Sequence, residues 1–166
     1  MQLNITTDYA IRMLNALGDG SVKTLDEISR ECQISKAYLG KLVRLLKEKE
    51  ILGSIVGIKG GVFLKKPLED ISFNEVFSIT EPTMKINRCL EDDSYCSSGR
   101  ADACPVRNYY QYIQEKLEKE YFTATLAQVV RGQWRPETGC GGREDPPELQ
   151  NPAEDNMEVR DNEKVS

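Results

Sequence analysis

Residues 24–50 read TLDEISRECQISKAYLGKLVRLLKEKE, and this stretch decides the fold. It opens on a capping box, because Thr24 and Glu27 can satisfy each other's backbone N–H groups at the start of a short helix that we expect to end near Cys32. Ser35 is placed to cap a second, longer helix. The apolar positions of that helix recur at helical spacing: Leu39, Leu42, Val43, Leu45 and Leu46. Two helices joined by a tight turn form the helix-turn-helix pattern.

The second helix of this pair has a basic face, formed by Lys36, Lys41, Arg44 and Lys47. Two short β-type runs follow at 54–56 and 62–64, with the glycine-rich turn 57–61 between them. A hairpin directly after such a helix is typical of the wing of a winged helix, which predicts DNA binding. The alternative is that any small α+β domain can carry a hairpin and that a lysine-rich face is merely solvated.

Other helix starts are visible on both sides of this unit. Thr6 or Thr7 is expected to cap a first helix, and Ser72 with Glu75 forms a second capping box. Pro105 suits the first turn of a long helix. That helix carries an apolar and aromatic stripe: Val106, Tyr109, Tyr110, Ile113, Leu117 and Tyr121. Since little further chain remains to cover the stripe, we expect a second subunit to cover it; packing within the same chain is the alternative.

The distribution of charge matters more than the net value of −5. Residues 1–66 hold eleven Lys and Arg against seven Asp and Glu, whereas residues 136–166 hold three against nine. The acidic tail therefore hides a basic N-terminal region, which suits a nucleic-acid-binding domain. The tail has almost no large apolar residues, so we expect it to be disordered.

The composition also excludes several classes of site. The 166-residue chain has no histidine, which removes Ser-His-Asp and Cys-His nucleophile pairs and histidine-ligated zinc. No phosphate-binding glycine loop and no paired catalytic acid and base are visible, so an enzyme is a remote alternative. There is no apolar run long enough for a membrane span and no signal-peptide core. With five cysteines, an odd number, we expect a cytoplasmic protein with reduced thiols.

Three of the five cysteines lie in the segment 89–104, CLEDDSYCSSGRADAC. A disulfide would use two of these thiols and leave the third unpaired, whereas a metal centre can use all three with a fourth donor from elsewhere. Zinc and an iron–sulfur cluster both fit this donor type, and redox switching or scattered structural cysteines remain alternatives. Cys140 lies in the acidic tail and is treated as a spare thiol.

These patterns together predict a mainly α-helical chain with a small β-hairpin wing. We expect a winged helix-turn-helix DNA-binding domain over residues 1–82 and a cysteine-bearing loop over 83–104. A dimerisation helix and a closing helix follow over 105–132, and the acidic tail occupies 133–166.

Four segments taken together resemble one known family. They are LNITTDYAIR at 3–12, ISKAYL at 34–39 with its continuation to residue 45, GGVFL at 60–64, and the three cysteines ahead of a long helix. The family is that of bacterial winged-helix iron–sulfur transcriptional regulators of the IscR and NsrR type, and the resemblance covers about residues 1–132. It implies a homodimer that binds palindromic double-stranded operator DNA, with a cluster near the dimer interface that controls DNA affinity. No membrane partner is expected, because the sequence has no apolar run long enough for a span.

The resemblance also implies the ligands. The IscR type takes a fourth ligand from a histidine three residues after the last cysteine, where this chain has Arg107. The NsrR type, a nitric-oxide sensor, uses an acidic residue in the first helix of the partner subunit, and Asp8 matches that position. The implied ligands are Cys89, Cys96, Cys104 and Asp8, and the resemblance favours [4Fe-4S] over [2Fe-2S]. The alternative for Asp8 is stabilisation of its own helix start, typically by 0.3–1 kcal/mol.

For DNA, we expect Ser35, Lys36, Tyr38 and Lys41 to lie nearest to bases or phosphates, with Arg44 and Lys59 on the backbone. Some family members carry an arginine in the wing where this chain has Val56. The sequence thus predicts a transcriptional regulator, most simply a repressor, that senses nitric oxide, redox state or iron–sulfur status. The alternative is a zinc-stabilised or cluster-free regulator of the same fold that responds to a metabolite or a partner protein. Members of the CymR type lack the cysteines, so the three-thiol segment argues against that branch.

Overall fold

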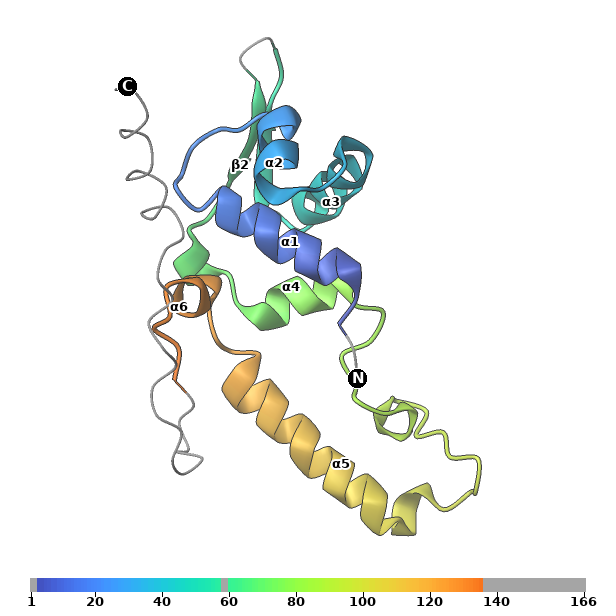
Figure 1. The fold of residues 1–166 in the computed structure, drawn as a ribbon. Helices are drawn as coiled ribbons and strands as arrows, with labels where there is room; N and C mark the ends of the chain where they lie inside the picture. The colour runs from blue at the N-terminus through green and yellow to red at the C-terminus, as the bar shows by residue number, and fades with distance from the viewer. Residues whose placement is uncertain (1–2, 58–59, 136–166) are drawn as a thin grey trace, which may run out of the picture. The chain divides into compact units, whose positions relative to one another are not determined.

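The computed structural model describes residues 3–57 and 60–135, whose elements run from α1 to α6 with a β-hairpin after α3 (Figure 1). Lys59 and residues 136–166, including Cys140, lie outside the described residues. Among the described residues, no helix has the length and apolar character needed to cross a membrane.

The helix-turn-helix unit consists of α1 (Ile5–Ala16), α2 (Leu25–Cys32) and α3 (Lys36–Glu48). Thr24 and Glu27 form the predicted capping box at the start of α2, and the side chain of Ser35 caps α3 as predicted. Gln33 ends α2 in the left-handed conformation, with φ of 56°, which turns the chain sharply into α3. Local side-chain chemistry therefore determines where these two helices begin.

The start of α1 differs from the prediction. The helix begins at Ile5 and is capped by Asn4, whose Oδ1 accepts the backbone N–H of Thr6 at 2.9 Å. The predicted cap at Thr6 or Thr7 is therefore wrong. Thr7 is fully buried, and its hydroxyl lies 2.7 Å from the hydroxyl of Thr80. A contact between distant parts of the chain occupies the hydroxyl that the local pattern assigned to capping.

The wing is a two-stranded antiparallel hairpin of β1 (Leu52–Ile55) and β2 (Gly61–Leu64), paired in the register Leu52↔Leu64, Gly53↔Phe63, Ser54↔Val62 and Ile55↔Gly61. The ring of Phe63 lies over Gly53, where an added Cβ would come within 2.3 Å of the ring, so any other residue there would force the ring to move. A bridge between Lys23 and Val62 attaches the hairpin to the segment before α2. The wing is thus anchored to the helix-turn-helix unit.

The same unit is completed by the short helix η1 (Leu68–Asp70) together with α4 (Phe73–Thr80) and α6 (Leu126–Val130). Ser72 caps α4 as predicted, but Glu75 does not close the predicted box; its carboxylate binds the Lys66 ammonium at 2.6 Å. An isolated bridge between Ser72 and Thr125 brings α6 against the start of α4 (Figure 1).

One hydrophobic core joins α1, α2, α3, β1, α4 and α6. Its largest fully buried side chains are Met13, Leu14, Leu17, Ile28, Leu39, Leu42, Leu46, Ile51, Leu52, Ile71, Val76 and Leu126. Because three of these leucines come from one side of α3, the core also determines which side of α3 faces outward.

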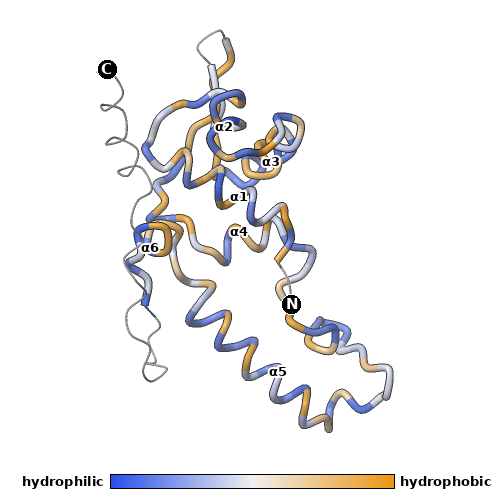
Figure 2. The backbone as a smooth tube through the Cα atoms, in the orientation of Figure 1, coloured by the Kyte–Doolittle hydropathy of each residue, from blue (hydrophilic) through white to orange (hydrophobic). Residues whose placement is uncertain are grey.

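The rest of the described chain is the cysteine-bearing segment and a long helix. The short turns η2 (Arg88–Leu90) and η3 (Ala101–Ala103) precede α5 (Pro105–Lys116), which continues into a π-helical turn, η4 (Leu117–Tyr121). Apolar and polar residues alternate in short blocks along α5 (Figure 2). Phe122 returns the chain to α4, where its ring meets that of Phe77 edge-on at a centroid distance of 5.1 Å. The mostly helical fold with one hairpin confirms the predicted fold class.

Candidate DNA interface and candidate metal centre

The outward side of α3 carries the cations expected from the sequence. Leu39, Leu42 and Leu46 are fully buried, so the opposite side of the helix faces solvent. That side bears four exposed residues, Lys36, Lys41, Arg44 and Lys47. Lys41, Arg44 and Lys47 follow one another at a spacing of three residues and so form a strip along the helix, and such a strip attracts the phosphates of DNA.

The interactions of these four side chains with the rest of the protein are weak. Three of the four have partners on the surface, Lys36 with Asp26, Arg44 with Glu48 and Lys47 with Ser54. Exposed ion pairs contribute about 0–1 kcal/mol, so phosphates can replace these partners at small cost. Within the part of the chain that the structure describes, Lys41 makes no ion pair and no side-chain hydrogen bond.

Two of the residues expected at DNA also have partners inside the protein. The Ser35 hydroxyl accepts the backbone N–H of Tyr38 at the start of α3. Tyr38 is half-buried: its ring meets Tyr9 edge-on at 5.1 Å, and its hydroxyl lies 2.7 Å from Thr6 Oγ1. The structure therefore connects Tyr38 to α1, a connection that the sequence pattern did not reveal.

Two apolar residues of the wing, Ile55 and Val56, are exposed. Val56 is 97% exposed and Ile55 is 51% exposed. An isolated exposed valine is ordinary on a protein surface, but on a hairpin next to α3 it is available for contact with DNA sugars and base edges. Lys59, expected to contact the DNA backbone, lies outside the described residues.

The three clustered cysteines lie on three different local structures. Cys89 is in η2, Cys96 is in the irregular stretch after it, and Cys104 immediately precedes α5. All three are free and half-buried. In the described ranges, no three side chains of the metal-ligand type are gathered closely enough to hold an ion. The structure thus places the cysteines on one segment without bringing them to a common point.

Arg107 holds this segment against α5. Its guanidinium donates to the carbonyl oxygen of Cys89 at 3.0 Å and to Ser94 Oγ at 3.2 Å. Further along α5, the buried Gln114 donates to the carbonyl oxygen of Met84 and accepts the backbone N–H of Ile86, at 3.0 and 2.9 Å. Sequence reasoning missed these contacts, because a glutamine on a helix face has no local signal that it is buried.

Two cysteines, Cys96 and Cys32, have pKa values shifted in opposite directions. Hydrogen bonds from the Ser98 side chain and from neighbouring backbone N–H groups lower the pKa of Cys96 to about 7. Burial raises the pKa of Cys32, the last residue of α2, whose thiol lies 3.6 Å from the carbonyl oxygen of Arg12 in α1. Metals and iron–sulfur clusters bind the thiolate form. Three free, partly accessible thiols fit a cluster as a donor set, whereas Cys32 fits a structural role.

Asp8 lies in the first turn of α1 and is half exposed. Its carboxylate makes a two-point contact with the Arg12 guanidinium, at 2.7 and 3.2 Å. An exposed pair of this kind, four residues apart on a helix, is worth about 0.3–0.5 kcal/mol. Asp8 is therefore paired but accessible, and in the described chain it does not form a ligand group with the cysteines.

Comparisons with known proteins agree with this architecture. The model of the Rrf2 family, described as iron-dependent transcriptional regulators, matches residues 3–132. Protein rrf2 of Nitratidesulfovibrio vulgaris is 28% identical over 134 residues, which cover 79% of this chain and 88% of that protein.

Two solved structures share the fold. The global cysteine regulator CymR of B. subtilis matches with a TM-score of 0.59 at 19% identity, over 80% of this chain and 98% of that one. IscR of T. potens matches with a TM-score of 0.57 at 19% identity, over 80% of this chain and 88% of that one. At this identity the two structures establish the winged-helix fold and leave the choice between their functions to the residues of this chain.

The family match spans the helix-turn-helix unit, the wing, the cysteine segment and α5. It confirms the prediction of a DNA-binding regulator rather than an enzyme. The chain belongs to the Rrf2 family of transcriptional regulators.

Proposed function

We propose that this regulator is a repressor whose affinity for operator DNA is set by an iron–sulfur cluster that responds to nitric oxide, redox state or iron–sulfur status. The observation that carries the proposal is the set of three free, half-buried thiols within residues 89–104, in a family described as iron-dependent. A purely structural role would not need three unpaired thiols on a segment that contributes no side chain to the hydrophobic core.

Cys89, Cys96 and Cys104 would hold the cluster, with Asp8 supplied by the partner subunit as the fourth ligand. A [4Fe-4S] cluster is the favoured form and [2Fe-2S] the alternative. When bound, the cluster would supply iron that reacts with nitric oxide or oxidants. The contribution of the chain is to hold the three thiols on a segment that Arg107 fastens to α5.

The DNA-binding part of the proposal assigns α3 to the major groove. Its exposed cations would contact phosphates, which position the protein, and the first turn of the helix would lie nearest to base edges. Cluster binding and DNA binding would both take place in the cytoplasm, where thiols stay reduced.

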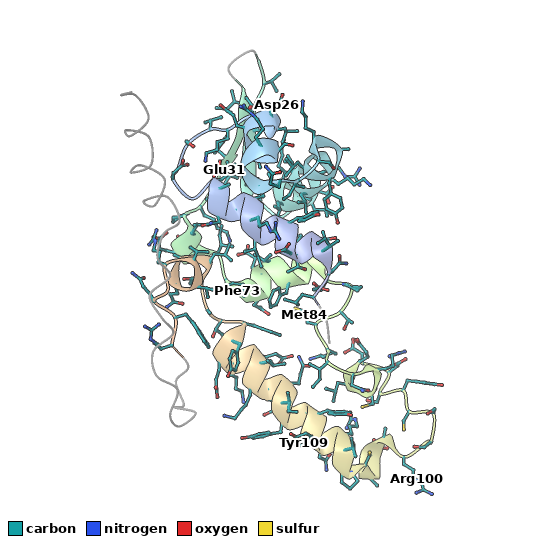
Figure 3. The ribbon with its side chains drawn as sticks, in the orientation of Figure 1. Asp26, Glu31, Phe73, Met84, Arg100 and Tyr109 are labelled. Atoms are coloured by element: carbon teal, nitrogen blue, oxygen red, sulfur yellow. The ribbon has the colours of Figure 1, made fainter. Side chains whose placement is uncertain are left out.

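The proposal includes a homodimer formed through α5. The inner side of α5 and of its continuation η4 contacts the same chain through polar groups, namely Gln114 in α5 and Glu118 in η4, the latter bound to Lys85 at 2.9 Å. Its aromatic side remains open: Tyr109 is 63% exposed and Tyr112 is 59% exposed (Figure 3 labels Tyr109). Large exposed aromatics at helical spacing are typical of a surface that a partner covers. A symmetric dimer would bind the two half-sites of a palindrome.

The test is an absorption spectrum of the full chain prepared without oxygen, with assays of iron, acid-labile sulfide and zinc, and with light scattering for mass. We expect a coloured dimer with iron and sulfide in stoichiometric amounts. A colourless protein with stoichiometric zinc would support the alternative of a zinc-stabilised regulator. A colourless, metal-free protein that still binds DNA would support a cluster-free regulator that answers to a metabolite or a partner protein.

Asp8→Ala tests the fourth ligand. We expect this variant to keep the dimer and its fold but to show an altered cluster spectrum and faster loss of the cluster, because one iron loses its carboxylate donor. Arg12→Ala is the matched control, since it breaks the same surface ion pair and leaves the carboxylate in place. If both variants keep the wild-type spectrum and lose only a small, similar amount of thermal stability, Asp8 serves its own helix and the fourth ligand is another group.

A further inference from the structure

A chain of hydrogen bonds links the first turn of α3 to the end of α4 through the N-terminus of α1. Tyr38 Oη lies 2.7 Å from Thr6 Oγ1, and Thr6 Oγ1 lies 2.9 Å from Asn4 Oδ1. The backbone N–H of Asn4 donates in turn to Glu81 Oε1 at 2.8 Å. The four residues come from three elements that are distant in sequence, separated by 32 positions at one junction and 77 at another.

The direction of each hydrogen bond follows from counting protons. Asn4 Oδ1 also accepts the backbone N–H of Thr6, which identifies it as the amide oxygen, and a carbonyl oxygen can only accept. A threonine hydroxyl has one proton, so Thr6 gives it to Asn4. Tyr38 must then donate its own proton to Thr6. The donors run from Tyr38 through Thr6 to Asn4, and the backbone N–H of Asn4 ends the chain on the Glu81 carboxylate.

This assignment limits what Tyr38 can do at DNA. Its only hydroxyl proton is committed to Thr6, so the phenol cannot donate to a phosphate while the chain of hydrogen bonds is intact. The edge-on contact with Tyr9 holds the ring from the side. Tyr38 lies one helical turn before Lys41, the exposed cation without a partner in the described chain. Tyr38 is therefore placed to orient the first turn of α3 rather than to donate its proton to DNA.

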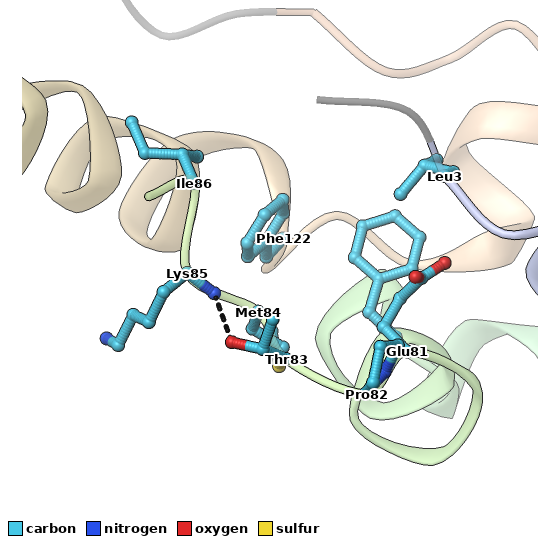
Figure 4. A pocket seen from close by; sticks show the side chains of 9 residues that line it. Leu3, Glu81, Pro82, Thr83, Met84, Lys85, Ile86 and Phe122 are labelled. Atoms are coloured by element: carbon cyan, nitrogen blue, oxygen red, sulfur yellow. Dashed lines mark hydrogen bonds between the residues drawn. The ribbon is translucent and has the colours of Figure 1, made fainter. Parts of the chain in front are cut away.

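Glu81, at the other end of this series of hydrogen bonds, is also held in place. Glu81 also accepts the hydroxyl proton of the buried Thr7, and it is the last residue before the segment that leads to the cysteines. Together with Leu3 and Phe122 it lines a hollow of about 250 Å³ (Figure 4). The N-terminus of α1 is thus fastened to the root of the cysteine segment on one side and to α3 on the other.

We propose that Thr6 is a positioning residue for DNA binding, which acts through Tyr38 to set the first turn of α3 and is itself held by Asn4 and Glu81. The inference goes beyond the proposed function, because it requires only that the protein binds DNA and does not depend on a cluster. It assigns a role in DNA binding to three residues that lie outside α3, namely Asn4, Thr6 and Glu81.

The test is a double-mutant cycle on DNA affinity, with a duplex selected by the wild-type protein from a random-sequence pool. Thr6→Val and Tyr38→Phe each remove one partner of the same hydrogen bond, and each is expected to weaken binding roughly 2- to 10-fold, the usual value of one hydrogen bond. The double variant is expected to bind no more weakly than the weaker single variant, because both remove the same interaction. If the two losses multiply in the double variant, Tyr38 contacts DNA independently and the proposal is wrong.

The salt dependence separates positioning from contact. A lost phosphate contact lowers the slope of log affinity against log salt by about one, whereas Thr6→Val should weaken binding equally at every salt concentration and leave the slope unchanged. A lower slope, or unchanged affinity, would overturn the proposal. Thr6→Ser, which restores the hydroxyl, should recover wild-type affinity. Ser78→Ala is the control, because its exposed hydroxyl donates only to the Glu75 carbonyl oxygen within its own helix.

Glu81 provides the last arm of the test. Glu81→Ala should weaken DNA binding as Thr6→Val does, with an unchanged salt slope and no further loss when the two are combined. Glu81→Gln, which keeps an oxygen for the Asn4 N–H, should be milder and covers the case in which Glu81→Ala does not fold. If Glu81→Gln folds, and if its loss of DNA affinity multiplies with that of Thr6→Val in the double variant, Glu81 does not act through the same hydrogen bonds. That result would overturn the role assigned to Glu81.

Discussion

Replacement of Cys89, Cys96 or Cys104 by alanine, one at a time, is expected to abolish the visible absorbance of the anaerobically prepared protein or to make it decay rapidly. Each cysteine would supply one of four ligand positions, and an alanine at any of them leaves an iron without its thiolate. Because the three side chains are only half-buried and lie outside the core, the metal-free variants should fold like the wild type. The measurement is the ratio of iron and sulfide to protein, with thermal unfolding beside it.

The other two cysteines serve as controls. Cys140→Ala should keep the full cluster. Cys32→Ala should also keep it, but should lower thermal stability, because it removes a buried side chain in contact with α1 and α2. An intact cluster in all three single variants of the loop would exclude these thiols as ligands.

Lys41→Ala and Arg44→Ala, combined in one variant, are expected to cause a larger loss of DNA affinity than the variants of Thr6, Tyr38 or Glu81. A hydrogen bond to a charged group is worth about 1.5–3 kcal/mol, so each lost phosphate contact should weaken binding about tenfold or more. Each loss should also lower the salt slope by about one, because one fewer counterion is released on binding. The measurement is a titration of the selected duplex at four or more salt concentrations.

Lys119→Ala is the matched control for this pair. It removes one positive charge, as each of the two substitutions in α3 does, from a side chain that is 76% exposed on η4 and is paired with Glu115. A general effect of net charge would appear in Lys119→Ala in proportion to the charge removed, whereas the loss of a contact at α3 would not. Wild-type affinity and slope in the double variant would show that another surface binds DNA.

Much of the N-terminal fold could be predicted because its signals are local. Thr24, Ser35 and Ser72 cap the helices that they were expected to cap, since a cap bonds to an N–H only two or three residues away. Leucines at helical spacing predict the buried side of α3. The cations lie on the opposite side, which must then face solvent. The same local reasoning failed at Glu75, where the ammonium of Lys66 is a stronger partner for a carboxylate than the expected backbone N–H.

The candidate metal centre could be predicted only as a composition. Three cysteines in 89–104 identify a donor type, and the absence of histidine narrows the choice of the fourth ligand. The cysteine-bearing segment is held by two side chains of α5, Arg107 and Gln114, which the sequence pattern did not single out. Their partners lie 18 and 30 positions away, beyond the reach of any periodic signal.

The sequence by itself therefore determined the helix-turn-helix, the wing, the cation strip of α3 and the thiol donor set, because caps, helical periodicity and turn residues act over a few positions. Only the tertiary structure decided which groups form hydrogen bonds with Thr6, Thr7 and Tyr38. A hydroxyl bonds to whichever group folding brings within about 3 Å. For Thr6 that group is Tyr38, and for Thr7 it is Thr80, so two residues that looked like helix caps instead join α1 to α3 and α4.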